Sequence, residues 1–406
     1  MDGGSIAWLQ VLASWLLYAN TWGLTNSFGV FQNHYTTVML SSSTPLAISW
    51  IGSLQTFLTM ATGLFAGVVL DSGHLRSAML VGISLQVLGM LMTSISSEYW
   101  HFVIAQGLCV GLGSGILSIV SLVILPLYWR KRKMTAGGIA ATGSGLAGVL
   151  YPIMLRRLFH EVGFPWAVRC LALLMLAMDV LAFLAIRPKT PERPSGPLFR
   201  LHFLKDKNYA LWVICFAFLV AAVYTPYFYD ASFALSIGID EQMAIYALSI
   251  MNASTLIGRL PPALLADRFG PINVLAPCTI GTIAILFSWL AVKSLPGLII
   301  TGALFCFVTG GMVSLMPLTV TNLTEDAAEY GTRIGMAYTI ASIGALLGNP
   351  IAGATLYRKE EAESGPKALQ LDFRGLWVFS GSSMAIAGLL MLWIRYRVAG
   401  LSCKVV

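Results

Sequence analysis

Long apolar runs separated by short polar breaks dominate the chain. A helix crosses the hydrocarbon core of a bilayer with about 20 apolar residues, and only helices or closed barrels satisfy their backbone polar groups in lipid. Runs this long are not barrel strands, so the pattern predicts an all-α polytopic membrane protein. The twelve predicted spans cover residues 7–30, 45–69, 78–97, 102–127, 135–158, 166–186, 209–229, 242–262, 274–293, 297–321, 334–357 and 376–396.

One polar break, residues 187–208, is longer than the others on its side of the predicted membrane and divides six spans from six. It holds Pro188, Pro191, Pro194 and Pro197, which prevent a continuous helix. We therefore expect two pseudo-symmetric six-helix bundles joined by a linker, an arrangement typical of alternating-access transporters. The expected division is 1–186 for the first bundle, 187–208 for the linker, 209–396 for the second bundle and 397–406 for the tail.

Charge is scarce and unevenly placed. Only 11% of the 406 residues are charged and the mean hydropathy is +0.77, whereas a soluble domain carries roughly 25% charged residues. Most of the 25 Lys and Arg fall on the side of the predicted spans that holds both termini, including the run Arg130–Lys133. Positive charge marks the cytoplasmic face, so we expect cytoplasmic termini, a lipid bilayer as partner and no nucleic acid.

Signs of catalysis or of bound metal are missing from the sequence. The six cysteines and five histidines show no metal-ligand spacing, and no phosphate-binding loop of the P-loop type is present. We expect no metal, no cofactor and no enzyme activity. The alternatives are an integral-membrane enzyme, which needs converging acids or metal ligands, and a non-transporting sensor with the same fold, which is expected to carry a large signalling tail.

Two breaks at equivalent stations of the two halves share a pattern. "GVVLDSGHLR" (67–76) and "ALLADRFGPIN" (263–273) each place an aspartate four residues after a small residue, with a glycine following. The first resembles, in degraded form, the loop signature of the major facilitator superfamily. The resemblance implies a conformational latch between the two halves, formed by Gly67, Asp71, Arg76, Asp267 and Arg268.

Three further stretches resemble the monocarboxylate-porter branch of that superfamily, in particular its fungal members. They are "DGGSIAW" (2–8), "YWRKRKMTAGGIAATGS" (128–144) and "GTRIGMAYTIASIGALLGNPIAG" (331–353). The resemblance implies secondary active transport of a small organic molecule by alternating access, with or without a coupled proton. It also implies that the signature positions anchor or shape the spans: Asp2, Gly3, Trp8, Tyr128, Arg130, Lys131, Arg132, Lys133, Gly138 and Gly143.

Arg259, in "TLIGRLPPALL", is the one basic residue that lies away from the ends of a predicted span. An intramembrane charge is expensive unless it faces a wet cavity or a partner. A guanidinium group suits a carboxylate because it offers two parallel donors, and a span-8 arginine of the resembled family is held to bind the anion. The alternatives are snorkelling to the cytoplasmic end and an ion pair with Asp267.

Other polar residues inside the spans are weaker candidates. For substrate binding they are Asn20, Asn26, Tyr224, Tyr227, Asn252 and Tyr338; polar groups joining helices and an interfacial aromatic belt are the alternatives. Asp179 is interpreted as the only carboxylate well inside a span and as a proton-coupling candidate, or else as a neutral or paired acid. Pro152 and Pro226 predict interruptions of spans 5 and 7.

The resemblance also bears on the cargo. Proton-coupled members of that branch use a lysine in span 1 and an acid before the span-8 arginine, and Asn26 and Thr255 occupy these stations here. A proton-coupled monocarboxylate importer is therefore the alternative. The favoured prediction is efflux of a monocarboxylate or weakly acidic secondary metabolite across the plasma membrane.

Overall fold

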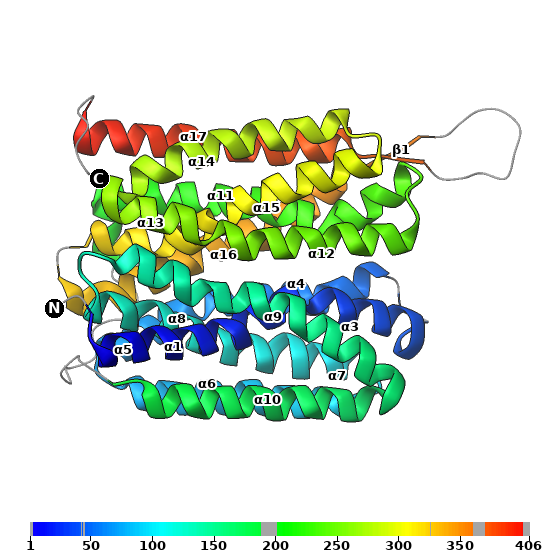
Figure 1. Cartoon of the computed structure of the whole chain (residues 1–406), viewed down its shortest axis with the longest axis horizontal. Helices are drawn as coiled ribbons and strands as arrows, with labels where there is room; N and C mark the ends of the chain where they lie inside the picture. The colour runs from blue at the N-terminus through cyan, green and yellow to red at the C-terminus, as the bar shows by residue number, and fades with distance from the viewer. Residues whose placement is uncertain are drawn as a thin grey trace, which may run out of the picture.

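The computed structural model describes residues 3–41, 43, 45–187, 201–324, 326–359 and 370–400, and it is almost entirely helical (Figure 1). Asp2, most of the predicted linker 187–208 and most of the predicted tail 397–406 lie outside the described residues.

The first part of the chain builds one group of packed helices. Three short stretches within it are π-helical, namely η1 (Ala19–Gly23), η2 (Tyr35–Met39) and η3 (Val103–Val110). In chain order the elements are α1 (Ser5–Tyr18), η1 (Ala19–Gly23), α2 (Leu24–Asn26), α3 (Phe28–His34), η2 (Tyr35–Met39), α4 (Pro45–Ala61), α5 (Gly63–Asp71), α6 (Leu75–Ser94), α7 (Tyr99–Phe102), η3 (Val103–Val110), α8 (Gly111–Tyr128), α9 (Lys133–Glu161) and α10 (Gly163–Ala185).

The second part builds a second group, which also contains one antiparallel pair of short strands. Its elements are η4 (Leu201–Lys205), α11 (Lys207–Ser236), α12 (Glu241–Gly258), α13 (Leu260–Phe269), α14 (Pro271–Ser288), η5 (Trp289–Ala291), α15 (Leu295–Thr319), η6 (Val320–Asn322), η7 (Ala327–Glu329), α16 (Tyr330–Ala354), β1 (Tyr357–Lys359), β2 (Gln370–Asp372) and α17 (Arg374–Ala399). Here η4 to η7 are 3₁₀ turns.

In the part of the chain that the structure describes, ten helices are long and apolar enough to cross a membrane. Two further helical rods, residues 5–39 and 241–269, complete the twelve predicted spans, although each is interrupted. The first changes to π-helix at Ala19, and the second breaks at Arg259. The predicted all-α polytopic fold is confirmed, but Pro152 and Pro226 lie inside the continuous helices α9 and α11, so the interruptions predicted there are wrong.

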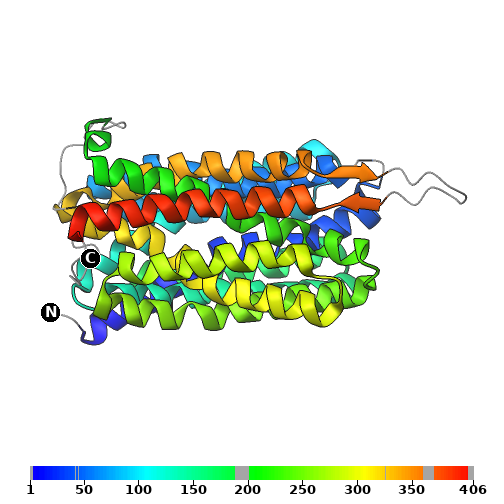
Figure 2. The ribbon, with the colours of Figure 1, turned by 90° about the horizontal axis from the view of Figure 1, so that it is seen from above.

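The two groups of helices lie side by side with their long axes roughly parallel (Figure 1). Helix α1 begins, and α17 ends, at the same end of the molecule, which we call the N/C end; the β1–β2 pair projects from the opposite, distal end (Figure 2). Large apolar side chains face outward along the helices, such as Leu184, 71% exposed, and Leu389, 69% exposed. An apolar outer surface of this extent is suited to lipid rather than water.

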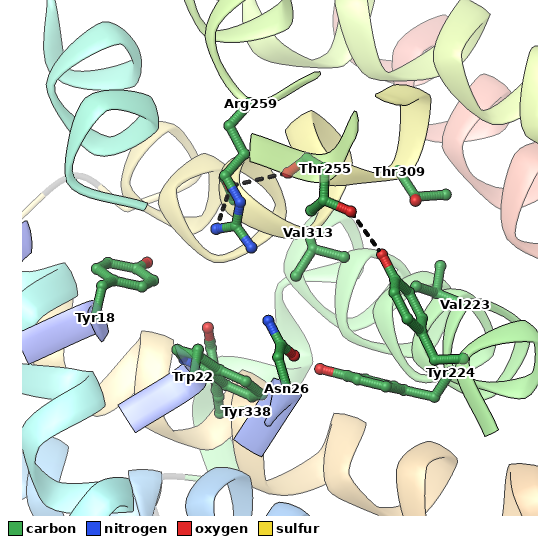
Figure 3. A pocket seen from close by; sticks show the side chains of 13 residues that line it. Tyr18, Trp22, Asn26, Val223, Tyr224, Thr255, Arg259, Thr309, Val313 and Tyr338 are labelled. Carbon is green, nitrogen blue, oxygen red and sulfur yellow. Dashed lines mark hydrogen bonds between the residues drawn. The ribbon is translucent and has the colours of Figure 1, made fainter. Parts of the chain in front are cut away.

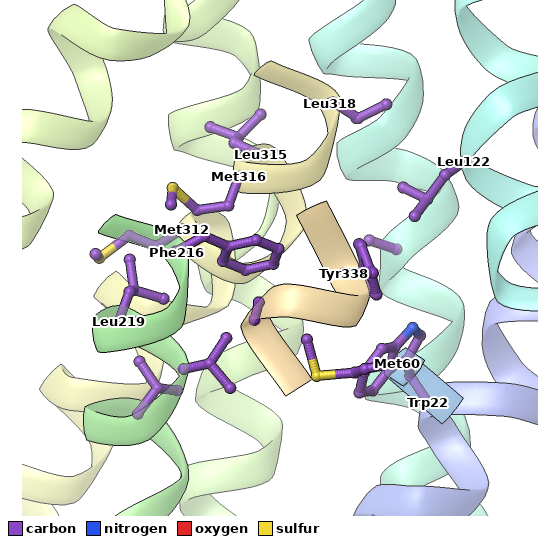
Figure 4. Packing of buried hydrophobic residues seen from close by; sticks show 14 of the residues in the cluster. Trp22, Met60, Leu122, Phe216, Leu219, Met312, Leu315, Met316, Leu318 and Tyr338 are labelled. Carbon is purple, nitrogen blue, oxygen red and sulfur yellow. The ribbon is translucent and has the colours of Figure 1, made fainter. Parts of the chain in front are cut away.

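Near the N/C end the two groups touch through glycines. A Cβ atom at Gly67 of α5 would overlap the carbonyl group of Gly331 of α16, and a Cβ atom at Gly335 would overlap the carbonyl group of Gly63. Glycine at these positions therefore allows the two backbones to approach closely. Farther along, aromatic and methionine side chains from both groups, among them Trp22, Met60 and Tyr338, fill the interface (Figure 4).

Candidate functional site

The break in span 8 places a charged side chain in the middle of the molecule. Pro261 and Pro262 lack the N–H groups that would bond the carbonyls of Ile257 and Gly258 in a regular helix. Helix α12 therefore ends at Gly258, and α13 begins at Leu260. Arg259 sits between them and extends its guanidinium group toward Tyr18, Trp22 and Asn26 (Figure 3).

A cavity of about 40 Å³ lies between the two groups of helices at this level. A buried water needs roughly 10–15 Å³ by this measure, so the cavity has room for about three waters, and a metabolite needs the helices to move apart. Polar and aromatic side chains from both groups dominate its wall. The lining residues are Tyr18, Trp22, Asn26, Val223, Tyr224, Tyr227, Thr255, Arg259, Thr309, Gly310, Val313, Ser314 and Tyr338.

Arg259 is 5% exposed and incompletely bonded. Its Nη1 donates to the carbonyl oxygen of Ala141 at 2.8 Å and to Oγ of Ser314 at 3.3 Å, while Nε has no partner among the described residues. No acidic side chain in the described part of the chain lies within 4.0 Å of the guanidinium group. A buried cation without an acidic partner is a ready site for an anion.

The two alternatives considered for Arg259 are not what the structure shows. The side chain points into the cavity and does not snorkel toward the N/C end (Figure 3). Asp267, the alternative partner, accepts hydrogen bonds from the backbone N–H groups of Met134 and Thr135 instead.

The structure brings five of the seven predicted substrate-binding residues together around the cavity: Arg259, Asn26, Tyr224, Tyr227 and Tyr338. Tyr227 shares a hydrogen bond of 3.0 Å with Thr255, and Tyr338 lies against Trp22 with ring centroids 6.2 Å apart. Asn252 is half-buried on α12 and lies outside the lining. Asn20 also lies outside it, because its side chain faces α10.

Sequence reasoning missed Tyr18, Trp22 and the α15 residues of the cavity. A signal for the first two existed, since Tyr18, Trp22 and Asn26 are spaced four residues apart and such a spacing forms one helical stripe. The two asparagines of span 1, Asn20 and Asn26, are six residues apart and do not share a face. Thr309 and Ser314 carry no comparable signal, because threonine and serine often bond their own helix, as both do here.

A buried polar network surrounds Asn20 within the first group of helices. Its Nδ2 donates to Oδ1 of Asp179 at 2.7 Å and to the carbonyl oxygen of Met175 at 2.9 Å. The hydroxyl of Tyr151 donates to Oδ1 of Asn20 at 2.8 Å, and Gln86 donates to the Asn20 carbonyl oxygen at 2.9 Å. Asp179 is therefore bonded to Asn20 in a place that solvent does not reach.

Asp179 is not the only buried acid in the spans, which corrects the interpretation from sequence. The sequence predicts that span 7 ends at residue 229 and that Asp230 lies in a polar break, but α11 continues to Ser236 and Asp230 is completely buried. It lies beside the indole of Trp289, in the second group of helices.

At the N/C end, the two latch aspartates each cap a helix of the other group. Asp71 accepts hydrogen bonds from the N–H groups of Gly331 at 2.9 Å and Thr332 at 2.6 Å, at the start of α16. Asp267 accepts from the N–H groups of Met134 at 2.9 Å and Thr135 at 2.7 Å, at the start of α9. A carboxylate at a helix N-terminus satisfies free N–H groups and interacts favourably with the helix dipole.

The latch arginines do not cross between the groups. Arg76 lies over the ring of Phe183 in its own group, 5.8 Å from the ring centroid. Arg268 lies over the ring of its neighbour Phe269, at 5.4 Å. Gly67, by contrast, is at the crossing point of α5 and α16, so the predicted latch set divides into residues at the interface and residues away from it.

The signature positions meet one another at the N/C end. Trp8 packs edge-on against Trp129, with ring centroids 5.1 Å apart. Gly3 adopts a positive φ of 109° just before α1. Tyr128 donates to the carbonyl oxygen of Arg187 at 2.9 Å, so the first and second signatures frame one corner of the first group.

The basic run and the glycines after it reach the second group. Lys133 donates to Oγ1 of Thr321 at 2.8 Å. Gly138 faces Ala263 of α13 in the second group, whereas Gly143 faces the Trp15 carbonyl of α1 within its own group. Of the remaining cations in the run, Arg130, Lys131 and Arg132, none lies on the cavity wall.

Comparison with known proteins agrees with this architecture. The sequence profile of the Major Facilitator Superfamily matches residues 5–349 and 210–402. The chain is 34% identical over 391 residues to the "MFS-type transporter dbaD" of Emericella nidulans, covering 96% of this chain and 86% of that protein. It is 34% identical over 356 residues to the "Aspyridones efflux protein apdF" of the same fungus, covering 87% of this chain and 73% of that protein.

The fold also matches a solved structure at low sequence identity. The crystal structure of a bacterial homologue of the iron transporter ferroportin in an outward-facing state superposes with a TM-score of 0.72. The match covers 97% of this chain and all of that chain at 13% identity, which supports the fold alone. The predicted superfamily is confirmed, whereas its monocarboxylate-porter branch stays a prediction. The chain belongs to the Major Facilitator Superfamily and is a multi-pass membrane transporter.

Proposed function

We propose that this transporter exports a weakly acidic secondary metabolite across the plasma membrane, with Arg259 as the residue that binds the anion. The observation that carries the proposal is a buried guanidinium group in an aromatic cavity with no acidic partner among the described residues. Fungal relatives named as efflux proteins for aspyridones and for agnestins support the direction of transport, which is export. The resemblance to the monocarboxylate-porter branch supports an acidic cargo.

The contact between Arg259 and Ala141 supplies a mechanism. Arg259 belongs to the second group of helices and Ala141 to α9 of the first, so their 2.8 Å hydrogen bond joins the two groups beside the cavity. A bound carboxylate competes with the neutral Ala141 carbonyl for the same donors, and charge-assisted hydrogen bonds are the stronger ones. Anion binding thereby weakens one tie between the groups.

The two groups are the proposed moving bodies, 1–186 and 209–396, with 187–208 as their linker. The N/C end is proposed to face the cytoplasm, since it carries most of the basic residues. Asp71, Asp267 and Gly67 then form a latch that is closed at the cytoplasmic end in this structure. A single cysteine at exposed Arg132 of an otherwise cysteine-free variant should react with a membrane-impermeant maleimide only after the membrane is opened.

Flux of a charged and an uncharged probe tests the function. In proteoliposomes that hold the purified protein, we expect export of salicylate and no more than background movement of salicylamide, its uncharged counterpart. Arg259→Gln removes charge-assisted hydrogen bonds worth about 1.5–3 kcal/mol, so salicylate affinity should fall about 10–100-fold. Arg259→Lys, which keeps the charge, should retain part of the flux.

Equal handling of the two probes, or unchanged salicylate flux in Arg259→Gln, would refute the anion site. Deleting the gene and profiling acidic metabolites inside and outside the cells then identifies the cargo. Accumulation inside the deletion strain supports export, whereas accumulation outside supports the alternative of a monocarboxylate importer.

A further inference from the structure

The π-helical turn of span 1 connects the cavity to a buried acid. Residues Ala19–Gly23 form this turn and are all buried. Tyr18 and Trp22 project from its two ends into the cavity wall. Asn20, between them, projects in the opposite direction toward Asp179. A shift of the turn relative to α10 therefore moves cavity side chains.

Among the described residues, Asn20 is the only hydrogen-bond partner of the Asp179 carboxyl group. Oδ1 of Asp179 accepts from Asn20, while Oδ2 has no hydrogen-bond partner among the described residues. An ionised carboxylate buried this way would have one neutral donor and no cation, and such burial is costly. The arrangement suits the protonated acid, with its proton on Oδ2.

The neighbours of Asp179 do not supply a positive charge. Four elements pack against α10: α1, η1, α6 and α9. The titratable side chain that they turn toward Asp179 is Tyr151 of α9, a neutral phenol that is bonded to Asn20. The described cations of α6, α9 and α10 lie near the ends of these helices, and most of them have other partners. They are Arg76, which lies over Phe183; Lys133, which is bonded to Thr321; Arg156; Arg157, which is paired with Glu161; and Arg169, which is bonded to Ser94.

A short polar route leads from Asp179 toward the cavity. Asp179, Asn20 and Tyr151 are joined by hydrogen bonds of 2.7 and 2.8 Å. One turn before Tyr151 on α9, Gly148 faces the side chain of Asn26, which lines the cavity. Tyr151 therefore lies one helical turn from the contact between Gly148 and Asn26, and water that enters beside Asn26 approaches Asp179 from this side.

We infer that Asp179 is a proton-binding residue whose charge controls how the π-helical turn of span 1 packs against α10. With the proton on Oδ2, Asn20 is held as observed and Tyr18 and Trp22 close the cavity. When the proton leaves to water, the carboxylate requires more donors, and the turn shifts to admit water or further N–H groups. This inference goes beyond the proposed function, because it assigns a proton site and its link to the cavity without reference to any cargo.

Hydrogen–deuterium exchange of the peptide covering residues 17–24 tests the link without a cargo. In the wild-type protein in detergent we expect exchange, corrected for the intrinsic pH dependence, to rise by several-fold as the pH increases. Asp179→Asn mimics the protonated acid, so exchange in this variant should stay at the low-pH level. Asp230→Asn, which changes the buried acid of the other group of helices, should respond as the wild type does.

A second variant separates proton binding from the link. Asn20→Ala keeps the acid but removes its hydrogen bond to the π-helical turn. The infrared carbonyl band of protonated Asp179 should therefore still titrate, while hydrogen exchange of residues 17–24 should no longer depend on pH. A pH-independent exchange in the wild type, or a wild-type response in Asp179→Asn, would overturn the inference. If Asp179→Asn fails to fold, the wild type and Asn20→Ala still decide it. These measurements do not use salicylate flux, so a failure of this inference and a failure of the proposed function can be told apart.

Discussion

The N/C end and the central cavity join the same two groups of helices by opposite means. At the N/C end backbone meets backbone where glycines of α5 and α16 touch, and the short side chains of Asp71 and Asp267 accept hydrogen bonds from backbone N–H groups across the interface. At the cavity the contact is made by long side chains, Arg259, Trp22 and Tyr338, which leave room for water. Touching backbones and short carboxylate side chains have little freedom to move, whereas long side chains can rotate, so the first region suits a latch and the second a binding site.

Gly67→Ala should have the largest effect, because it disturbs the backbone contact that closes the N/C end. The new methyl group meets the Gly331 carbonyl, and overpacking of this kind costs about 1–3 kcal/mol. We expect a lower unfolding temperature and a longer distance between spin labels at the exposed positions His74 and Ala327. The matched control is Gly281→Ala on α14, where a Cβ atom meets nothing within 4 Å. An unchanged label distance in Gly67→Ala would show that the glycine contact does not hold the N/C end closed.

Removing a latch aspartate should have the next largest effect. Loss of a helix cap costs about 0.5–2 kcal/mol, and Asp71→Ala and Asp267→Ala each remove a cap that crosses between the groups. The same spin-label pair should report a larger open fraction in both variants. Asp206→Ala is the control, because Asp206 caps α11 within its own group. Equal opening in Asp206→Ala would mean that general helix destabilisation, and not the crossing bond, is responsible.

Tyr227→Phe should produce the smallest change, and it tests whether the Tyr227 hydroxyl contributes to anion binding in the cavity. The ring keeps its contact with Phe305, at a centroid distance of 6.2 Å, and the hydroxyl group is lost together with its hydrogen bonds to Thr255 and to Sγ of Cys306. A typical hydrogen bond contributes about 0.5–1.5 kcal/mol, so salicylate affinity measured by calorimetry should fall about 2–10-fold. Tyr246→Phe, on the exposed side of α12, should have no effect. A loss as large as that expected for Arg259→Gln would make Tyr227 a primary anion ligand.

Much of the site could be anticipated because a charge inside a lipid-spanning helix is exceptional. Arg259 stands out for this reason, and the aromatic cluster around Tyr224 and Tyr227 accompanies it on the neighbouring span 7. The latch aspartates were found from a repeated pattern, but their partners were not. Backbone N–H groups of Gly331 and Met134 leave no trace in the sequence that could reveal which carboxylate they bond.

The sequence by itself determined that this is a twelve-span membrane protein with its basic residues gathered on one side, because lipid imposes a length and a polarity on each span that can be counted locally. Only the tertiary structure decided where each polar side chain points. A π-helical turn rotates Asn20 away from the cavity, and a longer α11 buries Asp230. Both outcomes depend on packing between distant segments, which no local pattern of apolar residues encodes.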